Sequence, residues 1–132
     1  MEAGREVRLE RGAVVLLSLD PTTGHEQRGT RPCVAVSDPD VIADQRFALV
    51  AVVPVTGTPG EGALYPPLQP GTSGLAKPSY VLIDHLRSVD KRRIRRVYGV
   101  LPPEELDALD DGLRLFLGLT RDAPAAAPAE EE

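Results

Sequence analysis

The sequence has little of what marks several common classes of protein. Of its 132 residues, one is a cysteine, Cys33, and two are histidines. A single cysteine excludes an intramolecular disulfide, and its place within an apolar run predicts a buried, inert thiol. The two histidines, at positions 25 and 85, and Cys33 are spread along the sequence and give no zinc-type ligand spacing. We therefore expect neither a metal site nor a cofactor.

Long apolar runs are also missing. No run is long enough to span a bilayer, and the chain does not open on a charged-then-apolar segment of signal-peptide type. We expect a soluble, cytoplasmic protein without membrane contacts. The sequence also lacks a phosphate-cradling Gly-Lys-Ser/Thr loop, a Gly-x-Ser-x-Gly elbow and a His-Glu-x-x-His helix. The enzyme classes that carry these motifs therefore gain no support.

The net charge of −5 argues against a generally basic nucleic-acid binder, but the charge is unevenly distributed. The acidic end of the chain accounts for much of it, and the remainder is close to neutral. Against that background, residues 91–96 carry five cations: Lys91, Arg92, Arg93, Arg95 and Arg96. Such a cluster can supply a local field that binds phosphates, or it can be a solvated surface turn. The sequence leaves both interpretations open.

Length and composition predict one folded domain with a modest core. Residues 1–10 are charged and lack periodicity, which predicts a flexible lead-in. Residues 11–119 hold the apolar patterning of the folded domain. Residues 120–132 are rich in Ala, Pro and Glu, which predicts a disordered tail.

The apolar pattern predicts mostly short strands. Strands are expected over 13–19, with both faces buried, and over 31–37, 47–53, 79–84 and 97–100, with turns at 38–40 and 87–90. The stretch 56–74 is dense in Gly and Pro, so we expect it to be mobile and to provide at most an edge strand. The fold class is therefore α+β but mostly β: a small, strongly bent sheet or barrel with a terminal helix.

The terminal helix is predicted over 103–117. Pro103 suits the first helical position, and Pro102 takes the place of a capping side chain. Gly112 in the middle of the helix is expected to cost about 1 kcal/mol relative to alanine. An apolar stripe at helical spacing should cover an open face of the sheet: Leu106, Leu109, Leu113, Phe116 and Leu117. Leu115 and Leu119 fall off that stripe and suggest a second contact.

The segment 24–32, Gly-His-Glu-Gln-Arg-Gly-Thr-Arg-Pro, forms a polar loop between the first two predicted strands. Loops held by rigid strands often carry function. Two guanidinium groups beside a carboxylate, an amide and an imidazole suit the recognition of an anion. Alternatively, the loop is merely solvated, with Glu26 paired to an arginine.

Taken in order, these landmarks resemble the MazF/PemK/Kid family of toxin endoribonucleases from type II toxin-antitoxin systems. The resemblance covers about residues 11–119. Its landmarks are the strand opening at Gly12, Asp20-Pro21, the loop 24–32, Val53-Pro54-Val55-Thr56, the segment 79–90 and the Pro-Glu-Glu-Leu start of the last helix. Of these, Gly-x-Glu-Gln-x-Gly-x-Arg-Pro is specific.

The resemblance implies an SH3-like, CcdB/MazF-like barrel that forms a homodimer and is held in check by a MazE-like antitoxin. It implies cleavage of single-stranded RNA at short sequences, without a metal, to 2′,3′-cyclic phosphate and 5′-hydroxyl ends. Carried over by position, the catalytic residues would be Arg31, Thr56 and Glu26. The RNA-binding residues would be His25, Gln27, Arg28, Asp84, His85 and Arg87.

The chemistry of these residues limits their roles. A guanidinium that stays protonated is a poor base but stabilises charge on a phosphorane-like transition state, so Arg31 should act mainly by electrostatics. Thr56 can donate its hydroxyl to a phosphate oxygen, or it can simply bond its own turn. Glu26 and His25 are candidates for the general base. His85 stands where many family members have glutamine, so the cleavage sequence cannot be carried over.

Two alternatives come from other functional classes. The same barrel resembles CcdB, a non-enzymatic poison that binds DNA gyrase mainly through its terminal helix. The chain would also resemble the family if it were an inactive relative that binds RNA without cutting it. The polar loop and Arg31 favour the nuclease, because a binding poison needs no such pocket.

Overall fold

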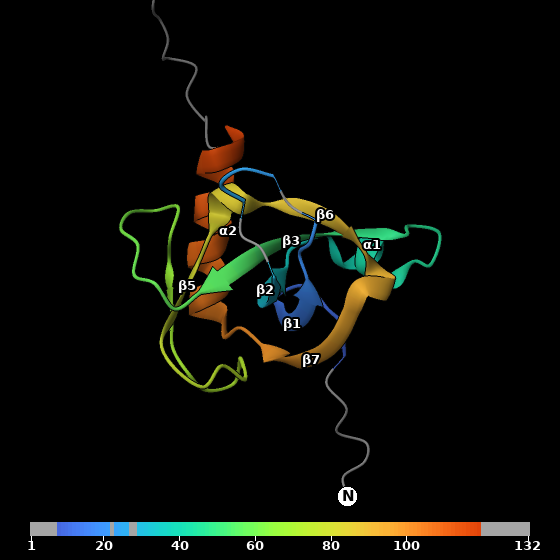
Figure 1. Ribbon diagram of the computed structural model, residues 1–132, viewed down its shortest axis with the longest axis horizontal. Helices are drawn as coiled ribbons and strands as arrows, with labels where there is room; N and C mark the ends of the chain where they lie inside the picture. Colours follow the sequence, from blue (N-terminus) through green and yellow to red (C-terminus); the bar gives the residue numbers. More distant parts are fainter. Residues whose placement is uncertain (1–7, 22, 27–28, 120–132) are drawn as a thin grey trace, which may run out of the picture.

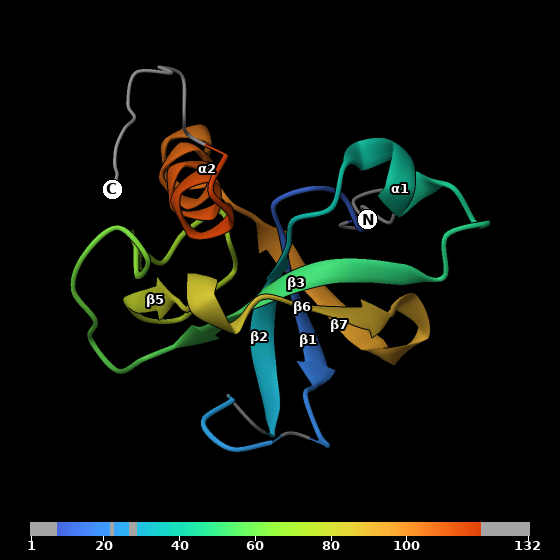
Figure 2. The same cartoon turned by 90° about the horizontal axis from the view of Figure 1, so that it is seen from above.

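The computed structural model describes residues 8–21, 23–26 and 29–119 of the chain. Most of the predicted lead-in, the tail 120–132 and the two site candidates Gln27 and Arg28 lie outside the described residues. Within them, the folded domain is one strongly bent, antiparallel sheet that carries a helix on either side (Figures 1 and 2).

Seven strands form this sheet in the described part of the chain, in the order β4-β5-β3-β2-β1-β7, with β6 paired to β3. The strands are β1 (Ala13–Ser18), β2 (Thr30–Ala35), β3 (Leu49–Thr56), β4 (Pro67–Leu68), β5 (Ser79–Val81), β6 (Arg87–Asp90) and β7 (Ile94–Val100). The helical elements are α1 (Pro39–Ala43), the 3₁₀ turns η2 (Ile83–His85) and η3 (Lys91–Arg93), and α2 (Pro103–Leu117). The predicted fold class, a mostly β barrel-like sheet with a terminal helix, is confirmed.

Both faces of the central strands are buried. Val14 and Val34, opposite each other in the β1–β2 ladder, belong to one apolar cluster, which also packs against α2. Val15 and Cys33, the next pair, belong to a second cluster on the other face. Because successive strand residues point to opposite faces, the near-continuous apolar run of β1 fills both clusters, as its sequence predicted.

Strand β3 organises the sheet. It pairs with β2 along one edge, from Cys33 opposite Pro54 to Ala35 opposite Val52. Along the other edge, it pairs with β6 over Leu49–Val52 and with β5 over its last two residues. The strand was predicted over 47–53 with its end at 54–57. It begins at Leu49 and continues through Pro54 to Thr56, and the Pro54 carbonyl accepts a bond from the Leu82 amide at 2.8 Å.

Two short elements replace predicted turns. The turn expected at 38–40 is the start of α1, in which Asp38 caps the helix by accepting from the Asp40 amide at 2.9 Å. The turn expected at 87–90 is strand β6, whose Val89 is buried against β3. Short elements of this kind lack the periodic pattern that predicts longer ones. The edge position expected for a strand within 56–74 is confirmed by β4, while the mobility of this stretch stays a prediction.

Helix α2 has the predicted bounds but a shorter buried face. Leu109 and Leu113 are buried, whereas Phe116 and Leu117 are 43% and 50% exposed. Their predicted place on the packed stripe is therefore wrong, because the last turn of the helix extends past the sheet (Figure 1). Among the described residues, no helix is long and apolar enough to cross a membrane.

Gly112 lies where α2 packs closely on the rest of the molecule. A Cβ there would lie 2.7 Å from the Ala63 carbonyl oxygen and 3.1 Å from Cγ1 of Ile83. We therefore expect Gly112→Ala to lower the free energy of unfolding by about 1 to 3 kcal/mol, the range for overpacking. Helix propensity alone predicts the opposite, a gain of about 1 kcal/mol.

Denaturant unfolding of Gly112→Ala beside Ala108→Gly tests this. Ala108 is exposed on the same helix, so its replacement should show the ordinary cost of glycine, about 1 kcal/mol. A Gly112→Ala protein more stable than the wild type would show that α2 does not pack as closely on Ala63 and Ile83 as described.

Candidate functional site

Three pockets meet at the end of β3. The loop pocket, about 280 Å³, is lined by His25, Glu26, Pro54, Asp84, His85, Leu86 and Arg87. The tyrosine pocket, about 370 Å³, is lined by Thr56, Thr58, Pro59, Gly60, Tyr65, Tyr80, Leu82 and His85. The strand-end pocket, about 310 Å³, is lined by residues of β2, β3 and 74–79 together with Tyr98, and includes Arg31 and Thr56. His85 is shared by the first two pockets and Thr56 by the last two, so the three pockets adjoin.

The strand-end pocket brings Arg31 and Thr56 together. In the β2–β3 ladder, Cys33 lies opposite Pro54. Two residues further along, the same register aligns Arg31 with Thr56. Both residues are half-buried. The Thr56 Oγ1 atom accepts from the Thr58 amide at 3.1 Å, so the bond to its own turn exists. The hydroxyl proton is not used in that bond, which leaves Thr56 able to donate into the pocket.

The loop pocket holds His25 and Glu26. The Glu26 carboxylate accepts from the Thr23 amide at 2.8 Å, and the Glu26 amide donates to the Thr23 carbonyl at 3.2 Å. These reciprocal bonds close a turn that places both side chains at the pocket. The base of the loop is closed by the Leu19 amide, which donates to the Gly29 carbonyl at 2.9 Å.

Three further predicted residues also line the loop pocket. Asp84 accepts from the Tyr65 hydroxyl at 2.8 Å through one oxygen, and its other oxygen lies 3.7 Å from Nε2 of His85. The hydrogen bond to Asp84 raises the pKa of Tyr65 above its ordinary value. Arg87 donates to the Leu19 carbonyl at 2.7 Å, so it holds the start of the loop besides lining the pocket.

The lone thiol lies beneath this site. Cys33 is fully buried, and burial raises its pKa to about 12. The prediction of a buried thiol is confirmed, and its high pKa makes it a poor nucleophile. In the described ranges, no group of three or more His, Cys, Asp or Glu side chains could hold a metal ion.

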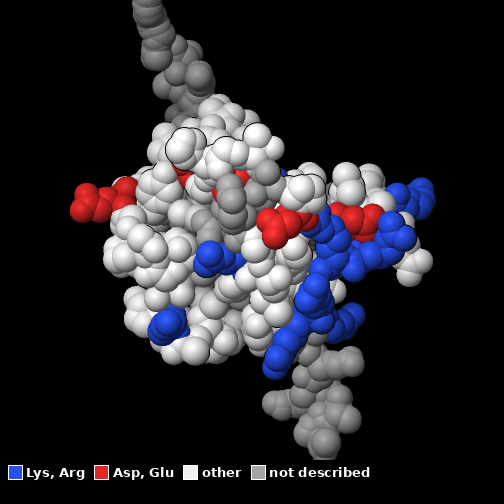
Figure 3. Space-filling model, viewed as in Figure 1, with Lys and Arg blue, Asp and Glu red and all other residues white. Residues whose placement is uncertain are grey.

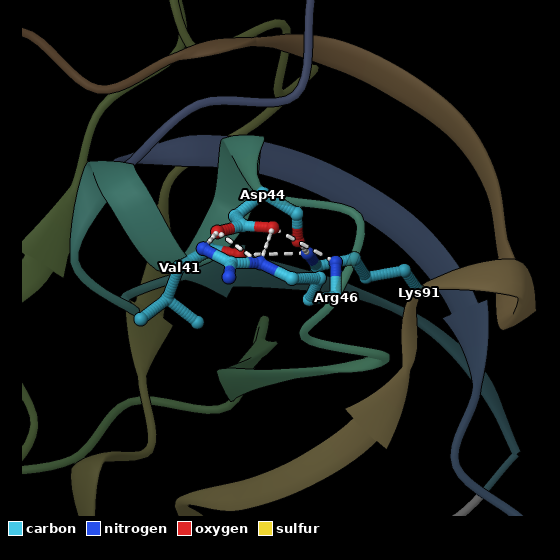
Figure 4. Close-up of polar contacts among 4 residues, drawn as sticks. All are labelled: Val41, Asp44, Arg46 and Lys91. Carbon is cyan, nitrogen blue, oxygen red and sulfur yellow. Dashed lines mark hydrogen bonds and ion pairs between the residues drawn. The ribbon is translucent and has the colours of Figure 1, made fainter.

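Several residues of the basic cluster 91–96 make contacts within the protein. Lys91 donates its ammonium to the Val41 and Asp44 carbonyls at the end of α1, at 2.7 and 3.1 Å (Figure 4). Arg92 pairs with Asp90 at 3.1 Å. Beside them, hydrogen bonds from Arg46 lower the pKa of Asp44. Figure 3 shows lysines and arginines as a stripe on one side of the molecule, with carboxylates beside them.

Arg93, another member of the cluster, contacts the start of the loop. Its guanidinium donates to the carbonyls of Ser18 and Asp20, each at 2.5 Å. Together with Arg87, it therefore binds three successive carbonyls at the point where β1 enters the loop.

We expect Arg93→Ala to lower the free energy of unfolding by about 1 to 3 kcal/mol, because two charged hydrogen bonds to carbonyls are lost. Arg95→Ala is the matched control. Arg95 is exposed, and its loss should change stability by less than about 0.5 kcal/mol. Equal midpoints for the two variants in denaturant unfolding would show that the Arg93 contacts do not stabilise the loop.

Sequence reasoning missed the two tyrosines of the tyrosine pocket. Tyr80 lies between buried Ser79 and Val81, so strand alternation directs its ring away from the core. This signal was present in the sequence. No such signal marked Tyr65, because its position depends on how residues 57–66 fold back on the sheet.

Comparisons with known proteins bear on the family and the fold of the chain. Residues 10–117 match the family model described as the PemK-like, MazF-like toxin of type II toxin-antitoxin systems. The structure resembles MazF from Deinococcus radiodurans at 30% identity and a TM-score of 0.70, covering 83% of this chain and 96% of that one. It also resembles a MazE-MazF complex of Deinococcus radiodurans, at 28% identity and a TM-score of 0.63 over 85% of this chain and 97% of that one.

A third similar structure is an endoribonuclease in complex with its cognate antitoxin from Mycobacterial species. Its identity is 23% and its TM-score 0.69, over 87% of this chain and all of that one, a likeness of fold. The match of the family model over most of the folded domain is the decisive finding. The chain belongs to the PemK-like, MazF-like toxin family of type II toxin-antitoxin systems.

Proposed function

We propose that this protein is a toxin that cuts single-stranded RNA at a short sequence, without a metal ion, leaving 2′,3′-cyclic phosphate and 5′-hydroxyl ends. The observation that carries the proposal is the pairing of Arg31 with Thr56 in one pocket at the strand ends. Family membership and relatives described as endoribonucleases support it.

In the proposed reaction, the ribose 2′-hydroxyl gives its proton to a base and attacks the adjacent phosphorus. The bond to the 5′ oxygen of the next nucleotide breaks, and that oxygen takes up a proton from water to become the 5′-hydroxyl. Arg31 stabilises the negative charge that builds on the phosphate oxygens, since its guanidinium remains protonated throughout. Thr56 donates a hydrogen bond to one of those oxygens. DNA lacks the attacking hydroxyl and should not be cut.

Glu26 and His25 are the candidates for the base that accepts the 2′-hydroxyl proton. Both lie in the loop pocket with Arg87 and Asp84, next to the tyrosine pocket that reaches Thr56. One Glu26 oxygen accepts from the Thr23 amide, which fixes the carboxylate at the pocket. The RNA backbone would run along this series of pockets, with His85 at the junction.

The proposed function also implies two protein partners, an antitoxin and a second copy of the chain. A MazE-like antitoxin would block the groove with an extended segment, and acidic side chains of that segment would suit Arg31 and Lys77, which line the strand-end pocket. Two copies of the chain would form the working dimer. The relatives solved as MazE-MazF complexes support an antitoxin partner.

The test is incubation of the purified protein with a long single-stranded RNA in excess EDTA, followed by mapping of the new ends. We expect discrete cuts with 5′-hydroxyl ends, and no cuts in DNA of the same sequence. Cuts that need added Mg²⁺ would overturn the metal-independent chemistry. A folded protein that cuts none of several RNAs would overturn the nuclease.

A second candidate function is favoured by the exposed end of α2. Leu115, Phe116 and Leu117 present apolar side chains to solvent there, and the resemblance to CcdB places the binding surface of a gyrase poison on the terminal helix. Inhibition of gyrase supercoiling by the wild-type protein, relieved in Phe116→Ala, would support this function over RNA cleavage.

A further inference from the structure

The tyrosine pocket has a composition unlike the rest of the surface. The chain has three tyrosines, two phenylalanines and no tryptophan, yet two of the tyrosines, Tyr65 and Tyr80, line this one pocket with the imidazole of His85. Aromatic rings beside a nucleic-acid path offer faces on which bases stack, whatever the base.

The protein holds the backbone of Tyr80 and the hydroxyl of Tyr65 before any ligand arrives. Tyr80 lies in the middle of a ladder, opposite Thr56 of β3 on one side and Pro67 of β4 on the other. Tyr65 is held by its hydroxyl bond to Asp84 at 2.8 Å, and Gly60 packs so closely on it that a Cβ there would lie 2.8 Å from the Tyr65 Cβ. A pocket with fixed walls loses little conformational entropy when it binds.

Its position determines what it would bind. The pocket shares Thr56 with the strand-end pocket and His85 with the loop pocket. An RNA strand with its phosphate at Arg31 and Thr56 that continues to the loop pocket would pass this opening.

We infer that the tyrosine pocket takes one unstacked nucleobase of the single-stranded RNA, from a nucleotide next to the cut, with the base stacked on the ring of Tyr80 and Tyr65 as the second wall. This inference rests on the proposed function for the position of the cut. In this inference, Tyr80 and Tyr65 bind the base, and the contacts around them select which base is accepted at that position.

The test uses short, 2′-O-methylated single-stranded RNAs, which cannot be cut because the attacking hydroxyl is blocked. Each carries one 2-aminopurine, whose fluorescence is quenched when it stacks, and the set moves this base along the mapped cleavage sequence or, if none is found, along a mixed sequence. The protein has no tryptophan, so the signal comes from the probe. We expect strong quenching at one position next to the cut.

The variants separate stacking from folding. Tyr80→Ala should remove the quenching at that position and weaken binding about 5- to 150-fold, the range measured for loss of one stacked base. Tyr80→Phe keeps the ring and should behave as the wild type. Phe47→Ala is the control, because Phe47 is 49% exposed and lines a different pocket. If Tyr80→Ala does not fold, Tyr80→Leu keeps apolar bulk and removes the aromatic face.

The outcomes distinguish the two proposals. The wild-type protein could bind RNA with quenching that depends on Tyr80 and yet cut no unmodified RNA. That result would support the base-binding pocket and overturn the proposed nuclease activity. Cleavage with quenching that is the same in Tyr80→Ala would keep the nuclease and overturn the pocket. Absence of RNA binding by the wild type would overturn both. A Tyr80→Ala effect confined to binding of the antitoxin would assign the pocket to a protein partner and overturn the inference.

Discussion

Replacement of Arg31 by alanine is expected to remove nearly all RNA cleavage while the protein stays folded. Loss of one group that stabilises charge in a transition state typically lowers the rate by about 100- to 1000-fold. Arg31 is half-buried near the start of β2 and belongs to neither apolar cluster. Its loss should therefore leave the core intact.

The measurement is the initial rate of cleavage of an RNA with the mapped sequence, beside a thermal unfolding curve for each variant. Arg31→Lys keeps the positive charge but not the fork of donors, so an intermediate loss is expected. Arg95→Ala, an exposed arginine of β7, is the control for net charge. Cleavage by Arg31→Ala at the wild-type rate would remove Arg31 from the catalytic residues.

Replacement of Gly99 by alanine is expected to destabilise the fold by about 3 kcal/mol or more, at the upper end of the range for overpacking. A Cβ on Gly99 would lie 2.2 Å from the Thr72 carbonyl oxygen and 2.8 Å from the Ser73 carbonyl carbon. These are backbone atoms, and the same Thr72 oxygen accepts from the Val100 amide at 3.2 Å. Relief of the clash therefore requires the segment to move away from β7.

Urea unfolding of Gly99→Ala beside Gly57→Ala provides the comparison. Nothing lies within 4 Å of a Cβ built on Gly57, so its replacement should change the free energy of unfolding little. Gly74 and Tyr98 line the strand-end pocket next to this contact, so we also expect Gly99→Ala to lower cleavage. Equal stability of the two variants would show that the segment adjusts at no cost.

Much of this fold could be predicted because its long elements have clear patterns. The apolar run of β1 and the helical stripe of α2 predicted their bounds to within one residue. Strand β6 could not be predicted, since Arg87–Asp90 has one apolar residue and becomes a strand only by pairing with β3. The exposed end of α2 was missed for a related reason: a stripe shows which side of a helix is apolar, but not how far the sheet reaches beneath it.

Some residues of the candidate site could likewise be predicted from the sequence, and others could not. Arg31, Thr56 and the loop residues were found through the resemblance of their motifs, and the structure brings those that it describes to adjoining pockets. Their roles stay predictions. Tyr65 and Arg93 could not be found from the sequence, because each acts through a contact with a distant segment: Asp84 for the tyrosine, and the end of β1 for the arginine.

The pairing of β3 along both edges has a consequence for how the protein opens. A strand with neighbours on either side cannot detach alone, so its central amide protons should exchange with solvent only when the whole domain unfolds. Thr56 is the last residue of that strand. Local unfolding elsewhere in the domain would leave Thr56 in place. Loss of activity on heating should therefore coincide with cooperative unfolding of the whole domain.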